Sequence, residues 1–392
     1  MIPEYSFHSR EMALPEPTPD AREHSNRVVE HIRGEIAASG GWISFARYME
    51  LALYAPGLGY YSAGARKLGK AGDFVTAPEI SPLYGQTLAR QVKQVLEAGF
   101  DEVLEVGAGS GALAATLLEE LERSGAVPRN YLILELSADL RERSRDTLAA
   151  RVPHLLERVA WLNRLPPVFS GVVLGNEVLD AMPAQVVRVQ SGKIEEGGVG
   201  VRNDRLGWSW RFASGGPLAA ARALGLPEGY RTEIQHAAQG FVRSLSGVLE
   251  KGVAFFVDYG FPQKEYYHPQ RKDGTLMCHY RHHAHADPFF LPGLQDITSH
   301  VDFSAIAGAA REGGLEVAGY ASQAQFLVNC GITELMSRTP AEDAAKFLPL
   351  ANQANRLMSP AEMGELFKVI AFARGFSLPL LGFGEGDRRM AL

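Results

Sequence analysis

The sequence predicts an α/β fold built on a largely parallel sheet. From residue 101 onward, short apolar runs alternate with segments whose apolar residues recur at helical spacing. A glycine-rich turn follows the first of these runs, and acidic or amide side chains follow others. Strands that alternate with helices are typical of βαβ units, whose ligands bind at the carboxyl ends of the strands. We therefore expect a ligand site along one edge of the sheet.

Composition narrows the class of protein. The chain has 392 residues, 46% of them hydrophobic, and a formal net charge of −6, which gives no general attraction to nucleic acid or to an anionic membrane. No apolar run reaches the roughly 18–20 residues of a membrane span. Two cysteines, Cys278 and Cys330, indicate a reducing compartment. The start of the chain resembles neither a signal peptide nor a transit peptide, so we expect a cytoplasmic protein.

The first hundred residues are predicted to be mainly helical. We interpret residues 1–25 as a flexible lead-in and residues 26–99 as an N-terminal helical region. A glycine pair closes the helix predicted at 24–41, and Ser44 is the expected N-cap of the next. A third helix is expected after Ser81, because a proline at the first helical position follows this N-cap candidate.

Residues 100–392 carry the predicted sheet, with insertions at 186–250 and 261–300. The segments that contain strands are 101–111, 130–137, 158–162, 170–183, 251–260, 315–322 and 365–375, and the helices between them are 112–125, 138–152 and 301–314. The first insertion carries alternating patches typical of β-hairpins, followed by a helix. The second is predicted to be a long loop, a feature that is usually functional or mobile in a compact domain.

The glycine turn "LEVGAGSGALA" indicates a nucleotide-type cofactor. Gly107, Gly109 and Gly111 allow positive φ and let a ligand approach bare backbone at a helix N-terminus. With Ala112 the stretch also satisfies the dinucleotide pattern G-x-G-x-x-G/A. The fuller pattern acid-x-Gly-x-Gly-x-Gly, which begins at Glu105, favours S-adenosylmethionine. Glu135, at the end of the next strand, can accept ribose hydroxyls from either cofactor.

Polar side chains at the end of the fourth strand indicate where an acceptor binds. Asn176, Glu177 and Asp180 lie beyond a buried strand, and their amide and carboxylates suit an amine or guanidinium. A cluster that only caps and stabilises the loop is the alternative. Tyr259 follows Asp258 on the same edge, where its ring could stack on a guanidinium or simply pack.

Taken in order, the motifs of the chain resemble those of the MidA family of S-adenosylmethionine-dependent methyltransferases. The match runs from about residue 43 to residue 375 and rests on "GDFVTAPEISPLYG", "LEVGAGSG", "NEVLDAMP", "VDYGFPQKEYYHPQRKDGTLMCHYRHHAHADPF" and "LQDITSHVDF". The resemblance implies a class I, Rossmann-like methyltransferase fold: a seven-stranded sheet with the last strand antiparallel. It also implies that the N-terminal helical region and the insertions form the acceptor side.

The resemblance and the motifs together assign expected roles. We expect the cofactor S-adenosyl-L-methionine to be bound by Glu105, Gly107, Ala108, Gly109, Gly111, Glu135 and Asn176. We expect the catalytic residues to be Glu177, Asn176, Asp180 and Glu79.

The mitochondrial member of this family is a respiratory complex I assembly factor that methylates an arginine of a respiratory-chain subunit. The resemblance therefore implies a protein arginine N-methyltransferase, with a complex I subunit as a candidate protein substrate. A cofactor-binding assembly chaperone with little catalysis and an NAD(P)-dependent oxidoreductase are the alternatives.

The second insertion contains a cluster of histidines. If residues 279–287 formed one extended strand, His279, His283 and His285 would face one way with Asp287 and could bind a metal ion, as in a zinc hydrolase. Methyl transfer needs no metal, and we expect none here. The preferred interpretation is that this loop covers the cofactor cleft or lines the acceptor channel.

Two further residues of this insertion, Asp296 and His300, could meet the substrate. They could equally cap the helix that follows.

Overall fold

The computed structural model describes residues 14–63 and 76–392. Its centre is a sheet in which seven strands follow the order β15-β16-β10-β5-β2-β3-β4, with a short strand, β14, paired to β10 outside this path. The strands are β2 (Glu102–Val106), β3 (Asn130–Leu134), β4 (Val159–Leu162), β5 (Phe169–Asn176), β10 (Leu249–Phe261), β14 (Val301–Asp302), β15 (Glu316–Ser322) and β16 (Phe367–Arg374). Only β16 is antiparallel to its neighbours β10 and β15. The expected seven-stranded sheet with an antiparallel last strand is confirmed.

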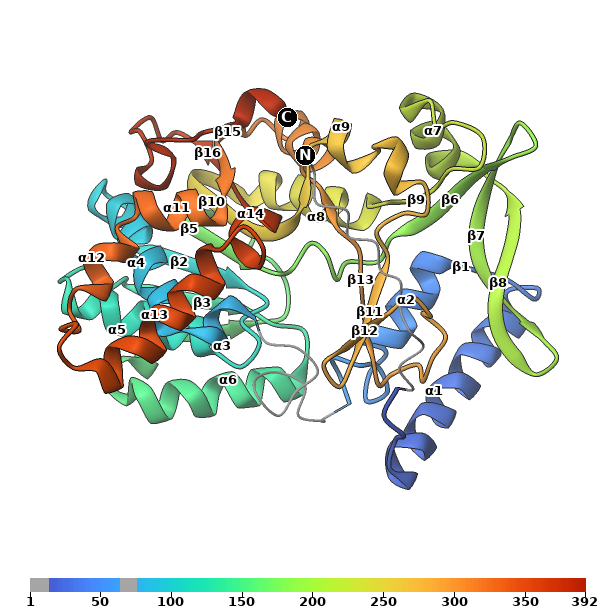
Figure 1. Cartoon of the computed structure of the whole chain (residues 1–392), viewed down its shortest axis with the longest axis horizontal. Coiled ribbons are helices and arrows are strands. Elements are labelled where there is room, and N and C mark those ends of the chain that lie inside the picture. Colours follow the sequence, from blue (N-terminus) through green and yellow to red (C-terminus); the bar gives the residue numbers. More distant parts are fainter. Residues whose placement is uncertain (1–13, 64–75) are drawn as a thin grey trace.

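Helices cover both faces of this sheet and bury two apolar layers against it. The first layer packs under α4 (Pro82–Glu97), α5 (Ala112–Arg123), α6 (Ala138–Arg151), α11 (Gln323–Asn329), α12 (Ile332–Met336) and α13 (Ala344–Met358). The second packs under α8 (His236–Val248) and α10 (Phe303–Glu312). Figure 1 shows the sheet and these helices in its left half and centre. This doubly covered sheet explains why its strands read as almost continuous apolar runs.

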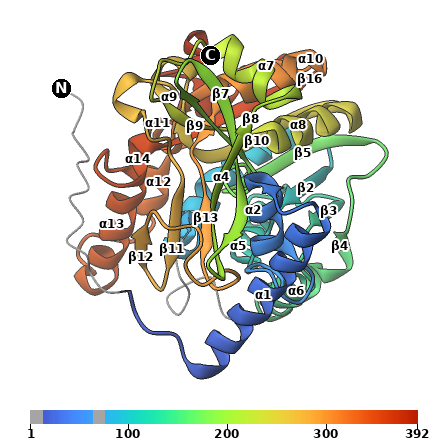
Figure 2. The ribbon, with the colours of Figure 1, turned by 90° about the vertical axis from the view of Figure 1, so that its right-hand side faces the viewer.

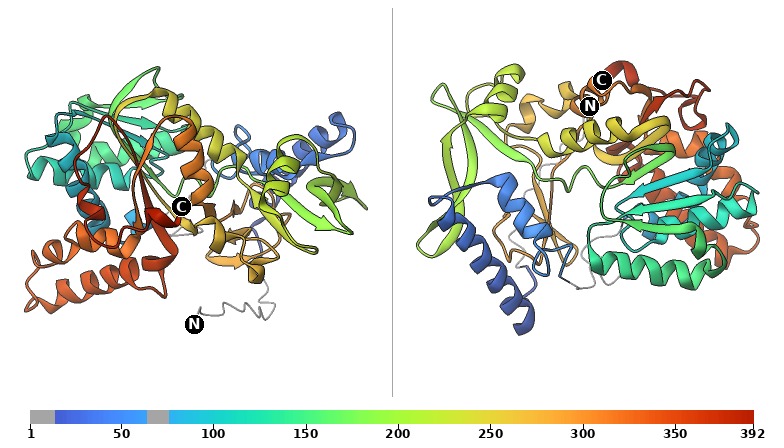
Figure 3. Two further views of the ribbon diagram at one scale, coloured as in Figure 1. Left: turned by 90° about the horizontal axis from the view of Figure 1, so that it is seen from above. Right: turned by 180° about the vertical axis from the view of Figure 1, so that it is seen from behind.

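A second lobe joins the N-terminal helices to the first insertion. Its members are α1 (Pro19–Ala38), α2 (Phe45–Tyr54), β1 (Ile43–Ser44), β6 (Gln185–Gln190), β7 (Lys193–Arg202), β8 (Arg205–Phe212), α7 (Gly215–Leu224) and β9 (Arg231–Ile234). The strands form an antiparallel sheet in which β1 pairs with β7, so two segments far apart in sequence share one sheet. Figure 2 looks onto the long β7–β8 hairpin, and the right-hand view of Figure 3 shows this lobe beside the main sheet.

The second insertion is not the long loop that the sequence predicted. It forms a three-stranded sheet of β11 (Met277–Tyr280), β12 (His283–His285) and β13 (Asp296–Thr298), preceded by the short helix α9 (Gln263–Tyr266). Arg281 and His282 both have positive φ and turn β11 back onto β12. These strands were not predicted because they are short and their sequences show no alternation of apolar and polar residues.

The predicted helix starts are largely correct. The Ser44 and Ser81 hydroxyls accept hydrogen bonds from the amides of Arg47 and Leu83, as N-caps of α2 and α4. However, α1 already begins at Pro19, inside the segment expected to be a flexible lead-in. Residues 1–13 of that lead-in lie outside the described residues.

Helices α11, α12, α13 and the short α14 (Met363–Leu366) were not predicted. They lie between β15 and β16, in a stretch interrupted by prolines. Pro349 stands inside α13 and has no amide to donate, which hid the helical pattern.

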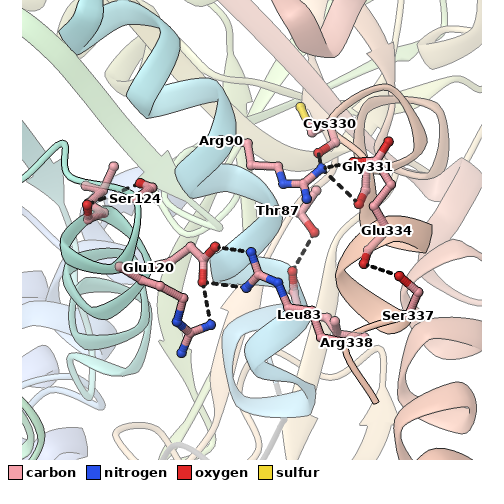
Figure 4. Close-up of polar contacts among 12 residues, drawn as sticks. Leu83, Thr87, Arg90, Glu120, Ser124, Cys330, Gly331, Glu334, Ser337 and Arg338 are labelled. Atoms are coloured by element: carbon pink, nitrogen blue, oxygen red, sulfur yellow. Dashed lines mark hydrogen bonds and ion pairs between the residues drawn. The ribbon is translucent and has the colours of Figure 1, made fainter. Parts of the chain in front are cut away.

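Polar contacts hold this missed segment against α4 and α5 (Figure 4). The Arg338 guanidinium donates to both carboxylate oxygens of Glu120 on α5, at 2.7 and 2.8 Å. The Arg90 guanidinium on α4 donates to the carbonyls of Cys330 and Gly331 and to the Glu334 carboxylate. The Glu120 side chain is only 4% exposed, so guanidinium donors take the place of water around its carboxylate.

We expect Glu120→Gln to destabilise the fold. The change leaves the Arg338 guanidinium without its carboxylate; because that guanidinium is 41% exposed, we expect a loss of roughly 1–3 kcal/mol, below the cost for a fully buried pair. The free energy of unfolding in urea measures it. Arg123→Ala removes an exposed partner of the same carboxylate and serves as the control, with an effect near 0–1 kcal/mol. Equal losses of stability in the two variants would contradict a specific role of the contact between Arg338 and Glu120.

Candidate active site

A cavity of about 970 Å³ opens at the carboxyl ends of β2, β3 and β5. The turn after β2, residues 134–137 after β3 and residues 176–178 after β5 form its wall on the side of the main sheet. Tyr54, Tyr61 and Glu50 from the N-terminal region form the opposite wall, together with Phe241 of α8. The cavity therefore lies at the predicted edge of the sheet and is closed by the second lobe.

The glycine turn has the predicted left-handed backbone. Gly107, Gly109 and Gly111 have φ of +67°, +55° and +80°. Gly111 is the residue before α5, so the turn directs free backbone amides of the helix N-terminus toward the cavity. Gly107, Ala108 and Gly109 line the cavity, whereas a Cβ at Gly111 would lie 2.8 Å from the Cα of Ser144. Gly111 thus allows α5 and α6 to pack closely, and the other two glycines expose the backbone.

Two acids predicted to bind the cofactor line the same end of the cavity. The Glu135 carboxylate accepts a hydrogen bond from the Ser137 amide at 2.9 Å, and burial raises its pKa. The Tyr131 hydroxyl donates to Glu105 at 2.6 Å, and burial, partly offset by that bond, raises the pKa of Glu105 to about 7. Glu135 lies where a ribose hydroxyl can be bound, and Glu105 has one oxygen already occupied by Tyr131.

Asn176 and Glu177 stand directly at the end of β5. Asn176 donates from Nδ2 to the Glu177 Oε1 at 3.1 Å, and the Ala77 amide donates to the same oxygen at 3.4 Å. Glu177 has φ of +53°, a left-handed conformation that few non-glycine residues adopt. Its amide donates to the Val257 carbonyl at 2.8 Å, which fixes this strained turn. The backbone therefore aims the Glu177 carboxylate into the cavity.

The charge on Glu177 is costly in this environment. Burial, followed by repulsion from Asp180, raises the pKa of Glu177 to about 8, although the Asn176 bond lowers it. Burial also raises the pKa of Asp180 to about 6, and its Oδ1 has no hydrogen-bond partner among the described residues. Asp258, which is buried beneath them, accepts bonds from three successive amides, of residues 178, 179 and 180. A cation brought into this end of the cavity would relieve the repulsion among these carboxylates.

The remaining catalytic candidates lie at different depths. Glu79 lines the cavity and accepts a hydrogen bond from the Ser110 hydroxyl, so it stands beside the glycine turn. Asp180 does not line the cavity, although its neighbour Ala181 does. Residues 72–75 of the motif "GDFVTAPE" lie outside the described residues.

Three tyrosines of the site were not predicted. The Tyr54 and Tyr61 rings stack at 5.4 Å, and their hydroxyls donate to the Ala181 carbonyl and to Asp296. The Tyr84 hydroxyl of α4 donates to Asn176. Tyr54 and Tyr84 lie on helices and Tyr61 in the turn after α2, and no sequence signal distinguished them from core residues.

The interpretation of the histidine cluster as a cavity wall is wrong for the described residues. None of residues 261–300 lines the cavity. The β11–β12 turn separates His279 from His283 and His285, which prevents the one-sided arrangement considered above. The insertion instead contacts the N-terminal helices: its Pro288 and Pro292 carbonyls accept bonds from Tyr48 and Ser25. Across residues 14–63 and 76–392, no three His, Cys, Asp or Glu side chains are grouped to hold a metal ion.

The structure decides the alternatives left open for Tyr259 and rules out the capping role considered for Asp296 and His300. The N-cap of α10 is Asp302, so neither Asp296 nor His300 caps that helix. His300 packs edge-on against the Tyr259 ring, which also contacts Phe367. Tyr259 therefore packs in the interior and offers no face to the cavity.

In the part of the chain that the structure describes, no helix is long and apolar enough to cross a membrane.

The residues at the cavity fit S-adenosylmethionine. The exposed glycine backbone leaves room for its amino-acid part, Glu135 can bind the ribose, and several carboxylates favour its positive charges. Fold and site together define a class I S-adenosylmethionine-dependent methyltransferase.

Comparison with known proteins agrees with this class. Residues 85–321, more than half of the chain, match the model of a family described as S-adenosyl-L-methionine-dependent methyltransferases, and the chain belongs to this family. The resemblance to MidA proteins is thereby confirmed. The glycine pattern was compatible with two cofactors, and the family match identifies the cofactor as S-adenosylmethionine and not a dinucleotide.

Individual relatives cover nearly the whole chain. A protein from Burkholderia thailandensis whose crystal structure contains S-adenosyl-homocysteine is 52% identical, with a TM-score of 0.94 over 97% of this chain and 100% of that one. The mitochondrial protein arginine methyltransferase NDUFAF7 of Mus musculus is 29% identical over 88% of this chain and 85% of its own length. Its Drosophila melanogaster homolog is 26% identical over 94% and 91%.

We expect Gly109→Val to abolish cofactor binding. A branched side chain is strained at φ of +55° and would occupy space that the ligand needs against the backbone. Titration calorimetry with S-adenosylhomocysteine measures the loss.

Gly125→Val is the matched control, because Gly125 also has positive φ, at +71°, but faces open space at the end of α5. It should show similar destabilisation and normal affinity. If both variants lost affinity equally, general strain would explain the result and the assignment of the turn would fail.

Proposed function

We propose that this chain transfers methyl groups from S-adenosylmethionine to an arginine side chain of a protein substrate. The observation that carries the proposal is the group of buried carboxylates at the acceptor end of the cavity. Glu177, Asp180 and Asp258 form no ion pair with a Lys, Arg or His of the described residues, so an incoming cation would stabilise their ionised forms. The names of the mouse and fly relatives support arginine as that cation.

A guanidinium is a poor nucleophile because it is protonated at every physiological pH. A carboxylate paired to it can hold positive charge on the nitrogens that do not react and leave more electron density on the third. Glu177 is placed for this role, since its left-handed backbone directs it into the cavity beside the glycine turn. Asn176 fixes the carboxylate, and Asp180 adds negative charge behind it.

The proton balance assigns Glu177 a second role. When bound, S-adenosylmethionine supplies a methyl group on a positively charged sulfur, which becomes neutral as the S–C bond breaks. Each transfer replaces one N–H bond of the guanidinium by an N–C bond, so one proton must leave. A carboxylate whose pKa is about 8 in the free protein can accept that proton near neutral pH and release it to solvent.

The partner and the compartment remain predictions. A respiratory complex I subunit is our candidate protein substrate, because the relatives are mitochondrial proteins and the family resemblance includes complex I assembly. Comparing arginine methylation of complex I by mass spectrometry in deleted and wild-type cells tests this target. For this chain itself we retain the expectation of a cytoplasmic location.

An assembly chaperone that binds the cofactor but hardly turns it over is the second hypothesis. Incubation of purified protein with labelled S-adenosylmethionine and cell extract separates the two. Label in arginine of a protein supports our proposal, whereas stable partner binding without label supports the chaperone.

We expect Glu177→Gln to reduce methyl transfer by at least ~10²-fold, the scale of losing one preorganised electrostatic partner. The change keeps the shape and the contact with Asn176 but removes the charge. Cofactor affinity should stay within a few-fold of wild type, as measured by calorimetry.

Glu233→Gln is the control for Glu177→Gln: Glu233 is a buried carboxylate whose pKa is also raised by burial, but it is bonded to Thr275 away from the cavity. It should leave transfer intact. Normal transfer by Glu177→Gln would make Glu177 a structural residue.

The pH dependence should follow Glu177. Below about pH 8 the free protein holds this carboxyl mainly protonated, so a guanidinium pairs with it only after a proton leaves. We therefore expect kcat/KM for the acceptor to rise with pH up to about 8 and then to level off. Glu177→Gln should lack this rise in its residual activity. A profile that is unchanged in the variant would assign the ionisation to another group.

A further inference from the structure

Asn176 can hold Glu177 only if its amide is turned one way. An ionised carboxylate accepts hydrogen bonds but donates none, so it must be met by the Nδ2 of the amide. The Asn176 oxygen then faces the opposite direction, toward the interior of the α4 helix layer. An oxygen buried there needs a donor, because an unpartnered buried acceptor is costly.

The Tyr84 hydroxyl is that donor. Tyr84 is 2% exposed on α4, a helix of the N-terminal region, and its hydroxyl donates to Asn176 Oδ1. Asn176 Nδ2 in turn donates to Glu177 at 3.1 Å. The three side chains form one directed chain of hydrogen bonds from α4 to the cavity, and each has little freedom to choose another partner.

We propose that Tyr84 is a positioning residue for Glu177: its hydroxyl holds the Asn176 amide in the orientation that presents Nδ2 to the carboxylate. The inference deepens the proposed function and rests on it for the role of Glu177. Tyr84 itself lines no part of the cavity and touches neither substrate nor cofactor.

The groups around Glu177 make this orientation consequential. Asp180 of the same loop, Asp258 of β10 and Asp296 of β13 all present negative charge to it, and the Tyr84 ring faces it from α4. Asn176 and the Ala77 amide are the donors to its carboxylate. If the amide turned over, an oxygen would replace one of these two donors and add to the repulsion.

The test is Tyr84→Phe, which removes one oxygen atom and keeps the ring. We expect cofactor affinity to stay within about threefold and acceptor kcat/KM to fall about tenfold, the effect of one lost buried hydrogen bond. The rise of kcat/KM with pH should move to higher pH, since the Asn176 bond lowers the pKa of Glu177. A purely structural role would lower stability without moving that rise.

A second measurement does not need an acceptor. Infrared difference spectra during a pH titration follow the protonated carboxyl groups, and subtracting the Glu177→Gln spectra assigns the Glu177 band. Tyr84→Phe should shift its midpoint to higher pH, and Asn176→Ala should shift it similarly. The double variant should add nothing to Asn176→Ala alone, because both changes break the same chain.

Tyr48→Phe is the matched control: it also removes a buried hydroxyl, one that donates to the Pro288 carbonyl away from the cavity. It should leave the Glu177 midpoint unchanged. An unshifted midpoint in Tyr84→Phe, or additive shifts in the double variant, would overturn the inference. If the shifts occur but no arginine is methylated, the positioning role stands and the proposed function fails.

Discussion

The structure depends on several carboxylates that are shielded from water at one edge of the main sheet. An isolated buried charge is unstable, so each must find donors or lose its charge. Asp258 takes three successive backbone amides, Glu105 takes the Tyr131 hydroxyl, and Glu177 takes an amide nitrogen and a backbone amide. These donors come from β3, from β5 and the loop after it, and from the start of α3 (Ala77–Ile80), whereas Asp258 is an acceptor on β10, so the positions of these elements are interdependent. This arrangement raises the pKa of Glu177, and a cation that enters the site would stabilise the ionised carboxylate.

The core of the fold could be predicted because its signals are local. Apolar runs ending in glycine or acid marked β2, β3, β5 and β10, and serine caps marked the starts of α2 and α4. The parts that escaped prediction lack such signals. β11 and β12 are short and rich in histidine, so they show no alternation, and Pro349 interrupts the pattern of α13. Tertiary contacts, such as those of Arg338 with Glu120, hold these segments in place.

The candidate site was predictable on one side only. Glycines at φ above zero and acids after strands are visible in a sequence, and they led to Gly107, Gly109, Glu135 and Glu177. The opposite wall is made of tyrosines whose hydroxyls find partners far along the chain. Nothing in their local sequence separates Tyr54 or Tyr61 from core residues, because their role arises from contacts with Ala181 and Asp296 far along the chain. The same holds for Tyr84, which lines no part of the cavity but contacts Asn176. The histidines are conspicuous in the sequence, but they lie on the β11–β12 hairpin and contribute nothing to the cavity wall.

The contact between the Tyr61 hydroxyl and Asp296 joins residues 235 positions apart. During synthesis the N-terminal residues leave the ribosome first, so Tyr61 must wait for most of the chain before this partner exists. The glycine turn and its flanking strands can pack earlier, since their contacts are closer in sequence. A nascent chain can thus shape the nucleotide-binding half of its cavity before the opposite wall is complete. The complete cavity is therefore a late product of biosynthesis, because its last contact needs a residue from the final hundred of the chain.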